Sequence, residues 1–275
     1  MRHVGCIAIL FLSMSCRPAT PDRPAGAEPP RGLLEGVATN ETRIVDLGHA
    51  LNPQNPHWPG PGYDPFKYEI FATLEKDKVL SGRFTMAEHT GTHLDAPSHF
   101  VGGQVSADKI PLRQFFGPAV VLDVRAKASA NADYLLSTGD ISVWERAHGR
   151  IPENSIVFMY SGWDARWTNF DRYKNADKDG RLHFPGFSTE ATRLLVEQRG
   201  VAGLGIDTLS VDYGMSKDFA VHHISHGKGK YHLENVANLG AIPASGAFVI
   251  VAPIKIDNGT GGPARIFALV RGGSQ

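Results

Sequence analysis

The stretch EHTGTHLDAPSHF, residues 88–100, places three histidines and one aspartate within eleven positions. These residues are His89, His93, Asp95 and His99, and all four have odd numbers. Because side chains alternate between the two faces of an extended chain, an extended segment would direct all four to one face. Imidazole and carboxylate groups together form sites for Zn²⁺, Mn²⁺ or Fe²⁺. Only twelve histidines occur in the 275 residues, so this grouping indicates a metal site.

Gly91 is the residue that lets this segment act as a site. On an extended chain His89 and His93 would lie about 13 Å apart, at roughly 3.3 Å per residue, whereas the ligands of one ion lie about 2 Å from it. Glycine permits a bend that would bring the two imidazoles together. The aspartate two positions further on can share an ion with His93. Pro97 then turns the chain, so that His99 is expected beside the cluster rather than in it.

A second histidine cluster occurs in AVHHISHGKGKYHLEN, residues 220–235. It offers His222, His223, His226, His232 and Glu234. One histidine and one glutamate from this segment could complete a site with two ions, although two histidines and one carboxylate already suffice for one ion. The spacing alone leaves open which of the histidines takes part.

The composition excludes several classes of function. Lys plus Arg and Asp plus Glu each number 28, and no basic patch with interleaved aromatic residues occurs, which argues against a nucleic-acid partner. The two cysteines, Cys6 and Cys16, lie near the N-terminus, so the expected domain has no thiol nucleophile, disulfide or Cys-ligated zinc. No Gly-x-Ser-x-Gly elbow occurs, which disfavours a serine hydrolase.

The N-terminal residues predict export. Residues 1–16, MRHVGCIAILFLSMSC, have a basic start and an apolar run too short to span a bilayer, which is typical of a signal peptide. Cys16 follows Ser15, as at a bacterial lipoprotein site, and would carry a lipid anchor. Residues 17–42 are rich in proline and predict an extended tether. Residues 43–275 are then expected to form one domain of a periplasmic or membrane-anchored protein.

The residue pattern of this domain predicts an α/β fold. Apolar or alternating runs predict strands at 41–51, 66–75, 81–90, 117–124, 155–162, 201–210 and 247–256. Helical patterns occur at 140–150 and 188–200, the second with Ser188 as its cap and Gly200 at its end. Residues 258–265, NGTGGPAR, predict a tight loop near the site or at an interface, in which Arg265 pairs with a carboxylate.

Aromatic side chains are expected to shape a substrate pocket. The segment NPQNPHWPGPGYDP, residues 52–65, contains five prolines and therefore predicts an irregular loop. His57 and Trp58 from this loop, together with Phe66 and Trp163, could stack against a flat ring. A small molecule is thus the expected partner.

The segment HTGTHLDAPSHF, residues 89–100, resembles the His-x-Gly-Thr-His-x-Asp-x-Pro-x-His pattern of the putative cyclase family, which includes bacterial kynurenine formamidases and isatin hydrolases. Every fixed position of the pattern is matched. GIDTLSVD at 205–212, FAVHHISHGKGKYHLENVANL at 219–239 and GTGGPARIFAL at 259–269 resemble further blocks of the family in the same order. The resemblance extends over roughly residues 43–270 and implies a single domain with a swivelling β/β/α fold.

The resemblance also implies a chemistry. It identifies a metal-dependent hydrolase of amide-like bonds that uses one or two divalent ions, Zn²⁺ or Mn²⁺, and forms a homo-oligomer. His99 would be the catalytic histidine, a role suited to the near-neutral pKa of imidazole, and His223 would be a neighbour of the site. The implied metal ligands are His89, His93, Asp95, His222 and Glu234.

These observations predict a hydrolase that cleaves a C–N amide bond of a small aromatic substrate, similar to an arylformamidase. An isatin-type cyclic amide or lactone hydrolase is the alternative among enzymes. An exported metal-binding or solute-binding lipoprotein without catalysis is the alternative from another class. The presence of His99 argues against this last alternative, because a protein that only binds has no use for a proton-transfer group.

Overall fold

The start of the described chain is helical where an extended tether was expected. The computed structural model describes Met1 and residues 32–272, so the predicted signal peptide beyond Met1 and the tether up to residue 31 lie outside the described residues. Helix α1 (Leu33–Ala38) packs Leu33 against Phe248 and Leu269. The tether prediction is therefore wrong for this segment, because Leu33 and Val37 lie one turn apart on the same helix face and bury apolar surface together.

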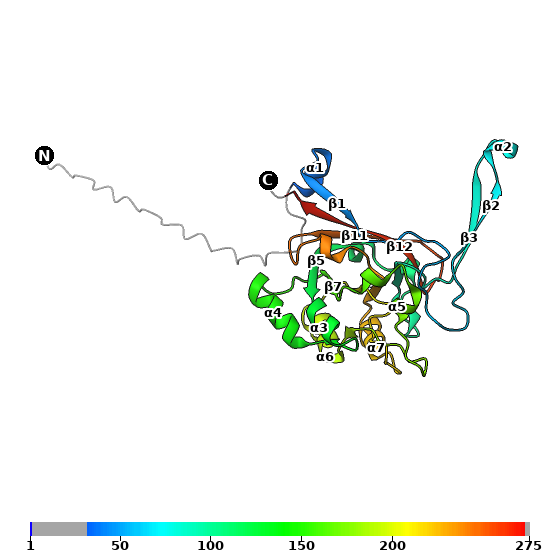
Figure 1. The fold of residues 1–275 in the computed structure, drawn as a ribbon. Helices are drawn as coiled ribbons and strands as arrows, with labels where there is room; N and C mark the ends of the chain where they lie inside the picture. The colour runs from blue at the N-terminus through cyan, green and yellow to red at the C-terminus, as the bar shows by residue number, and fades with distance from the viewer. Residues whose placement is uncertain (2–31, 273–275) are drawn as a thin grey trace.

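An eight-stranded sheet forms the centre of the molecule (Figure 1). Its strands are β1 (Thr42–Asp46), β4 (His93–Asp95), β5 (Phe116–Asp123), β7 (Ile156–Tyr160), β9 (Gly203–Ile206), β10 (Tyr231–Glu234), β11 (Phe248–Pro253) and β12 (Gly261–Arg271). They follow the order β1-β12-β11-β5-β7-β9-β10-β4, and β4 also pairs with β12, so the sheet closes on itself like a barrel. The run β5-β7-β9-β10 is parallel and the remaining pairs are antiparallel.

The longest strand, β12, covers residues 261–265 of the segment 258–265 that was expected to be a tight loop. Its first three residues pair with β4, and the rest pair with β1 or β11. The loop prediction is wrong from Gly261 onward, because pairing with three strands outweighs the low strand preference of glycine. The expected ion pair is present, with 2.7 Å between Arg265 Nη2 and Asp46 Oδ2. The segment also reaches the predicted site, since Gly261 pairs with Asp95.

Helices cover the outer face of the parallel strands (Figure 1). They include α4 (Thr138–His148), α6 (Thr189–Arg193) and α7 (Ala220–Gly227). Helix α3 (Arg125–Ala130) follows β5, and α5 (Phe170–Lys174) packs Tyr173 in a separate core. The short elements are 3₁₀ turns at Pro97–His99, Ala107–Lys109, Leu112–Phe115, Trp163–Arg166 and Leu239–Ala241 and a small pair of strands, β6 (Leu135–Leu136) and β8 (Gly186–Phe187). Ser188 caps α6 as predicted, and its Oγ accepts a hydrogen bond from Ala191 N at 3.1 Å. The helix then continues as a π-helical turn over Leu194–Gln198. No helix within residues 32–272 is long and apolar enough to cross a membrane.

The buried core lies on both sides of the parallel strands. Along β5, Ala119 and Val121 face the inside of the barrel, while Val120 and Leu122 pack beneath the helices. Burial on both faces explains why such strands form unbroken apolar runs in the sequence. The α/β single-domain prediction is confirmed.

Strands β4 and β10 bring their polar side chains to the same face of the sheet. Leu94 and Leu233, at the middle of each strand, are fully buried in the barrel interior. Because side chains alternate along a strand, the neighbours of these leucines point to the opposite face. These neighbours include His93, Asp95 and Glu234, which the sequence predicts as metal ligands.

A hairpin projects from the body of the molecule (Figure 1). It consists of β2 (Lys67–Ala72) and β3 (Ser81–Thr85), with the short helix α2 (Leu74–Asp77) near its tip. Its large apolar side chains are exposed: Tyr68, Ile70, Phe71, Leu74, Val79, Leu80 and Phe84. An isolated two-stranded hairpin has marginal stability in water. No other element of residues 32–272 covers these side chains.

Candidate metal centre and active site

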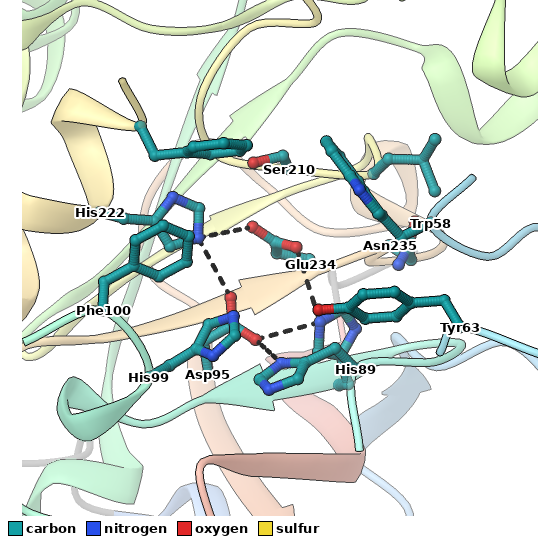
Figure 2. A pocket seen from close by; sticks show the side chains of 13 residues that line it. Trp58, Tyr63, His89, Asp95, His99, Phe100, Ser210, His222, Glu234 and Asn235 are labelled. Carbon is teal, nitrogen blue, oxygen red and sulfur yellow. Dashed lines mark hydrogen bonds and ion pairs between the residues drawn. The ribbon is translucent and has the colours of Figure 1, made fainter. Parts of the chain in front are cut away.

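The bend at Gly91 brings His89 to the strand that carries His93 and Asp95, as the sequence predicted. Gly91 has a left-handed φ of +69°, and a Cβ at this position would lie 2.4 Å from Leu51 Cδ2. His89 Nδ1 lies 2.5 Å from Asp95 Oδ1, and His93 Nε2 lies 3.1 Å from the same oxygen. Two imidazoles thus converge on one carboxylate oxygen (Figure 2).

The second cluster reaches this point through strand pairing. In the antiparallel register of β10 and β4, Glu234 lies opposite His93, and its Oε2 is 3.5 Å from His93 Nε2. Helix α7 brings His222 from the other side, with Nε2 3.4 Å from Asp95 Oδ2 and 3.5 Å from Glu234 Oε1. The pair that the resemblance selected, His222 and Glu234, therefore lies with the first cluster. His223 is exposed on the helix, as expected of a neighbour.

The second ring nitrogen of each central histidine has a partner of its own. His93 Nδ1 lies 2.9 Å from Gly91 O, and His222 Nδ1 lies 2.6 Å from Asp212 Oδ2. His89 Nε2 lies 3.1 Å from the hydroxyl oxygen of Thr260. Such outer partners fix the orientation of an imidazole and leave its other nitrogen free for a metal. No sequence pattern nominated Asp212, because it lies outside both histidine clusters.

The charges of this cluster are buried. Asp95 and Glu234 are 1% and 5% exposed. Burial raises the pKa of Asp95, but the charges of His89 and His93 outweigh this effect and hold the pKa well below its usual value. Burial and the neighbouring Asp95 raise the pKa of Glu234. Burial lowers the pKa of His93, yet the carboxylates raise it to about 9. A cation bound at this nitrogen would replace the proton.

The donor set fits a divalent cation. Three imidazoles and two carboxylates are the ligand types that Zn²⁺ and Mn²⁺ accept. His93 Nε2 is buried without a hydrogen-bond partner, which is expected of a nitrogen meant for a metal. The two oxygens of Asp95 face different histidines, Oδ1 toward His89 and Oδ2 toward His222, so the carboxylate can serve one ion or bridge two.

His99 lies at the edge of this cluster. The turn Pro97–His99 follows β4 and stacks the His99 ring on that of His89, with centroids 3.8 Å apart. One ring nitrogen of His99 comes within 4.8 Å of ligand atoms of His89 and Asp95. Burial lowers the pKa of His99 to about 4, so its ring is neutral near pH 7.

Two further histidines lie behind the site. His232 and His226 are fully buried, and their rings stack with centroids 4.2 Å apart. His232 Nε2 lies 2.5 Å from Ser225 Oγ. One ligand-type atom of His232 also falls within 4.8 Å of atoms from Asp95, His222 and Glu234. The sequence left open whether either histidine binds a metal. It did not predict the strand register that places His232 opposite Asp95.

A cavity of about 230 Å³ opens over the cluster. Its lining consists of Trp58, Tyr63, His89, His93, Asp95, His99, Phe100, Leu209, Ser210, Phe219, His222, Glu234 and Asn235. Figure 2 shows Trp58 and Tyr63 on one side of the carboxylates and Phe100 on the other. Of the four predicted pocket residues, Trp58 alone lines this cavity.

The other three residues predicted for the pocket lie outside this cavity. Trp163 lies in a separate core, where its Nε1 donates to Tyr173 O at 2.7 Å. Phe66 stacks on Phe84 at the base of the hairpin, and His57 packs on Phe170. Tertiary packing decides which aromatic ring of a loop is buried, and the sequence carries no signal for this. The missed lining residues Tyr63, Phe100 and Phe219 do lie close in sequence to Trp58, His99 and His222, respectively.

Two known proteins are similar to this chain over most of its length. An isatin hydrolase of Roseibium aggregatum is 32% identical over 256 residues, which cover 87% of this chain and 96% of that protein. A kynurenine formamidase of Bacillus cytotoxicus is 28% identical over 228 residues, covering 82% of this chain and 96% of that protein. Each match covers nearly the whole length of the relative.

A solved structure shows the same fold. Isatin hydrolase A from Labrenzia aggregata, bound to benzyl benzoate, superposes with a TM-score of 0.82 and 39% identity, covering 87% of this chain and 98% of that one. The cyclase-type fold prediction is therefore confirmed. Residues 45–213 match the family model described as putative cyclase. The chain thus belongs to the putative cyclase family.

Proposed function

We propose that this hydrolase cleaves the C–N bond of a small aromatic cyclic amide of the isatin type. The observation that supports this most is the convergence of His89, His93, Asp95, His222 and Glu234 at one end of an aromatic cavity. Trp58, Tyr63, Phe100 and Phe219 line that cavity and offer flat apolar faces to a ring. A carbonyl carbon of a bound ring would then lie near the ligand atoms.

The five converging residues would hold one or two divalent ions, Zn²⁺ or Mn²⁺. When bound, such an ion supplies Lewis-acid polarisation of the amide carbonyl and activation of water. Burial of the two carboxylates strengthens their attraction for a cation.

His99 would move the proton. Its ring would accept one proton from the attacking water and return it to the ring nitrogen as the C–N bond breaks. The new acid releases the second proton to solvent, so the products are a carboxylate and an amine. Stacking on His89 holds the His99 ring in place, with an interplanar angle of 20°. A protein that only binds metal would gain nothing from a neutral histidine at this position.

The degree of similarity favours a cyclic amide over a formamide. The two isatin hydrolases are 32% and 39% identical and cover 87% of this chain. The kynurenine formamidase is 28% identical and covers 82%. An arylformamidase activity is the second candidate, since it breaks the same type of bond next to an aromatic ring.

A substrate comparison tests this proposal. The purified protein, loaded with zinc or with manganese, would be assayed on isatin, formanilide and an aromatic lactone. We expect isatin to have the highest kcat/KM. Preference for formanilide would favour the second candidate, and no hydrolysis of any of the three with either metal would contradict the proposed function.

We also infer that the protein self-associates through the hairpin β2–β3. Its exposed side chains, among them Phe71 at 59%, Leu80 at 60% and Phe84 at 56%, form an apolar surface that no other part of residues 32–272 covers. A standard interface buries about 800 Å² per partner, which seven such side chains approach. A second copy of the chain, with the same exposed hairpin, provides a matching apolar surface.

A further inference from the structure

A threonine on the segment Gly259–Gly261 connects Glu88 to His89. Thr260 Oγ1 donates to Glu88 Oε2 at 2.5 Å, and Thr260 N donates to the same oxygen at 3.0 Å. The same hydroxyl oxygen lies 3.1 Å from His89 Nε2. The other ring nitrogen, Nδ1, is the one that faces Asp95.

The direction of these hydrogen bonds follows from the chemistry of the groups. An ionised carboxylate can only accept, so the single hydroxyl proton of Thr260 is used toward Glu88. Toward His89 the hydroxyl oxygen can then only accept, and Nε2 must carry a proton. In a neutral imidazole this leaves the lone pair on Nδ1.

The backbone around Thr260 is fixed. Thr260 O accepts from Ala96 N at 2.8 Å, just beyond β4, and Gly259 O accepts from Ala107 N at 2.9 Å. The two flanking glycines permit close approach: a Cβ on Gly261 would lie 2.5 Å from His89 Cε1, and a Cβ on Gly259 would lie 3.0 Å from Glu88 Oε1. The glycines of NGTGGPAR thus make room for the histidine and the glutamate.

We propose that Glu88 and Thr260 are positioning residues, which hold His89 in the Nε2–H tautomer and so present Nδ1 to the metal. This inference rests on the metal site of the proposed function. Thr260 is then the outer hydrogen-bond partner of His89. The corresponding partner of His93 is a backbone carbonyl, and that of His222 is Asp212. Second partners of this kind raise metal affinity by 10- to 100-fold in other sites.

The test is zinc affinity, measured by competition with a chromophoric chelator. Thr260→Val keeps the shape and removes the hydroxyl, and we expect zinc to bind roughly 10- to 100-fold more weakly. Thr260→Ser should restore binding. Thr90→Val is the matched control, because Thr90 is also buried next to His89 but its hydroxyl has no hydrogen-bond partner. Glu88→Gln, at a half-buried position, should weaken binding in the same direction.

Two readouts separate positioning from general stability. In a His89→Ala background, Thr260→Val should have no further effect on zinc affinity, because the group on which Thr260 acts is gone. In two-bond ¹H–¹⁵N spectra of the zinc-loaded protein, Nε2 of His89 should be protonated in the wild type. Equal zinc affinity of Thr260→Val and wild type would overturn the inference. It would also be overturned if Thr260→Val lowered zinc affinity as much in the His89→Ala background as in the wild type. A wild type that binds no zinc at all would instead overturn the proposed function.

Discussion

Glu234 lies directly opposite His93 across the antiparallel strands β10 and β4, with 3.5 Å between Oε2 and Nε2. This register joins two polar segments that are far apart in the sequence. A slip of one residue would turn Glu234 to the barrel interior and Leu233 to the site, because the side-chain period of a strand is two. The site therefore depends on the apolar packing of Leu94 and Leu233 as much as on its own polar groups.

Trp58 is expected to contribute to substrate binding rather than to the chemical step. Trp58→Ala removes one wall of the cavity, and loss of stacking worth about 1 kcal/mol plus buried area should raise KM for isatin about tenfold with a smaller change in kcat. His57→Ala is the matched control from the same loop, because His57 packs on Phe170 outside the cavity. An unchanged KM for Trp58→Ala would remove this ring from the binding site.

Much of the site could be predicted because its information is local. The odd-numbered spacing, the bend at Gly91 and the turn at Pro97 are all contained in one short segment. Alternation along β4 then follows from strand geometry alone. The cap at Ser188 is equally local, since it needs a hydroxyl and a helix that begins after it.

The features that the sequence did not reveal depend on contacts between distant segments. Thr260 supports a histidine 171 positions away. Asp212 supports His222, ten positions away, across a loop for which no spacing rule exists. Trp58 and Trp163 are the same residue type, yet only packing decides that one lines the cavity and the other is buried elsewhere. β12 has glycines that favour a loop locally, but three neighbouring strands supply the backbone pairing.

Stability below pH 4 should depend on Asp140, which caps helix α4. Burial raises the pKa of this carboxyl, but hydrogen bonds from Lys127 and Tyr134 outweigh it and lower the pKa from 3.8 to about 2. The lowered pKa means that the ionised form stabilises the fold above pH 3.8, and that this contribution is lost as the pH falls toward 2.

Asp140→Asn should therefore lower the free energy of unfolding by about 1 kcal/mol at pH 7, the usual value of a helix cap with a partly exposed partner. Urea titrations of both proteins would show this difference shrinking between about pH 4 and the lowest pH at which the wild type still unfolds cooperatively. A difference that stayed constant over this range would show that the charge of Asp140 is not responsible.

The hairpin should control the oligomeric state. Leu80→Glu combined with Phe84→Glu places charges on its apolar surface, and we expect light scattering to report a monomer with an unchanged circular dichroism spectrum. Leu112→Glu is the control, because Leu112 is 75% exposed but lies on the body of the molecule. A wild-type protein that is itself monomeric would contradict the inferred interface.

Export is tested on Cys16, which lies outside the described residues. Cys16→Ser should abolish membrane attachment and leave a folded protein in the soluble fraction, since a lipidated cysteine would be the predicted anchor. Recovery of the wild type from the cytosol with Met1 retained would contradict the prediction of a signal peptide.

The central claim is that the residues around Asp95 hold a metal while His99 moves a proton. The most direct measurement is metal content beside kcat for His93→Ala and His99→Ala, with His223→Ala as an exposed control from the same part of the chain. We predict that His93→Ala loses metal and activity together, and that chelation has the same effect on the wild type. His99→Ala should keep its metal and lose roughly 10²- to 10⁴-fold in kcat, the usual contribution of a general acid–base group. Full activity of His93→Ala without metal, or wild-type turnover by His99→Ala, would contradict the account.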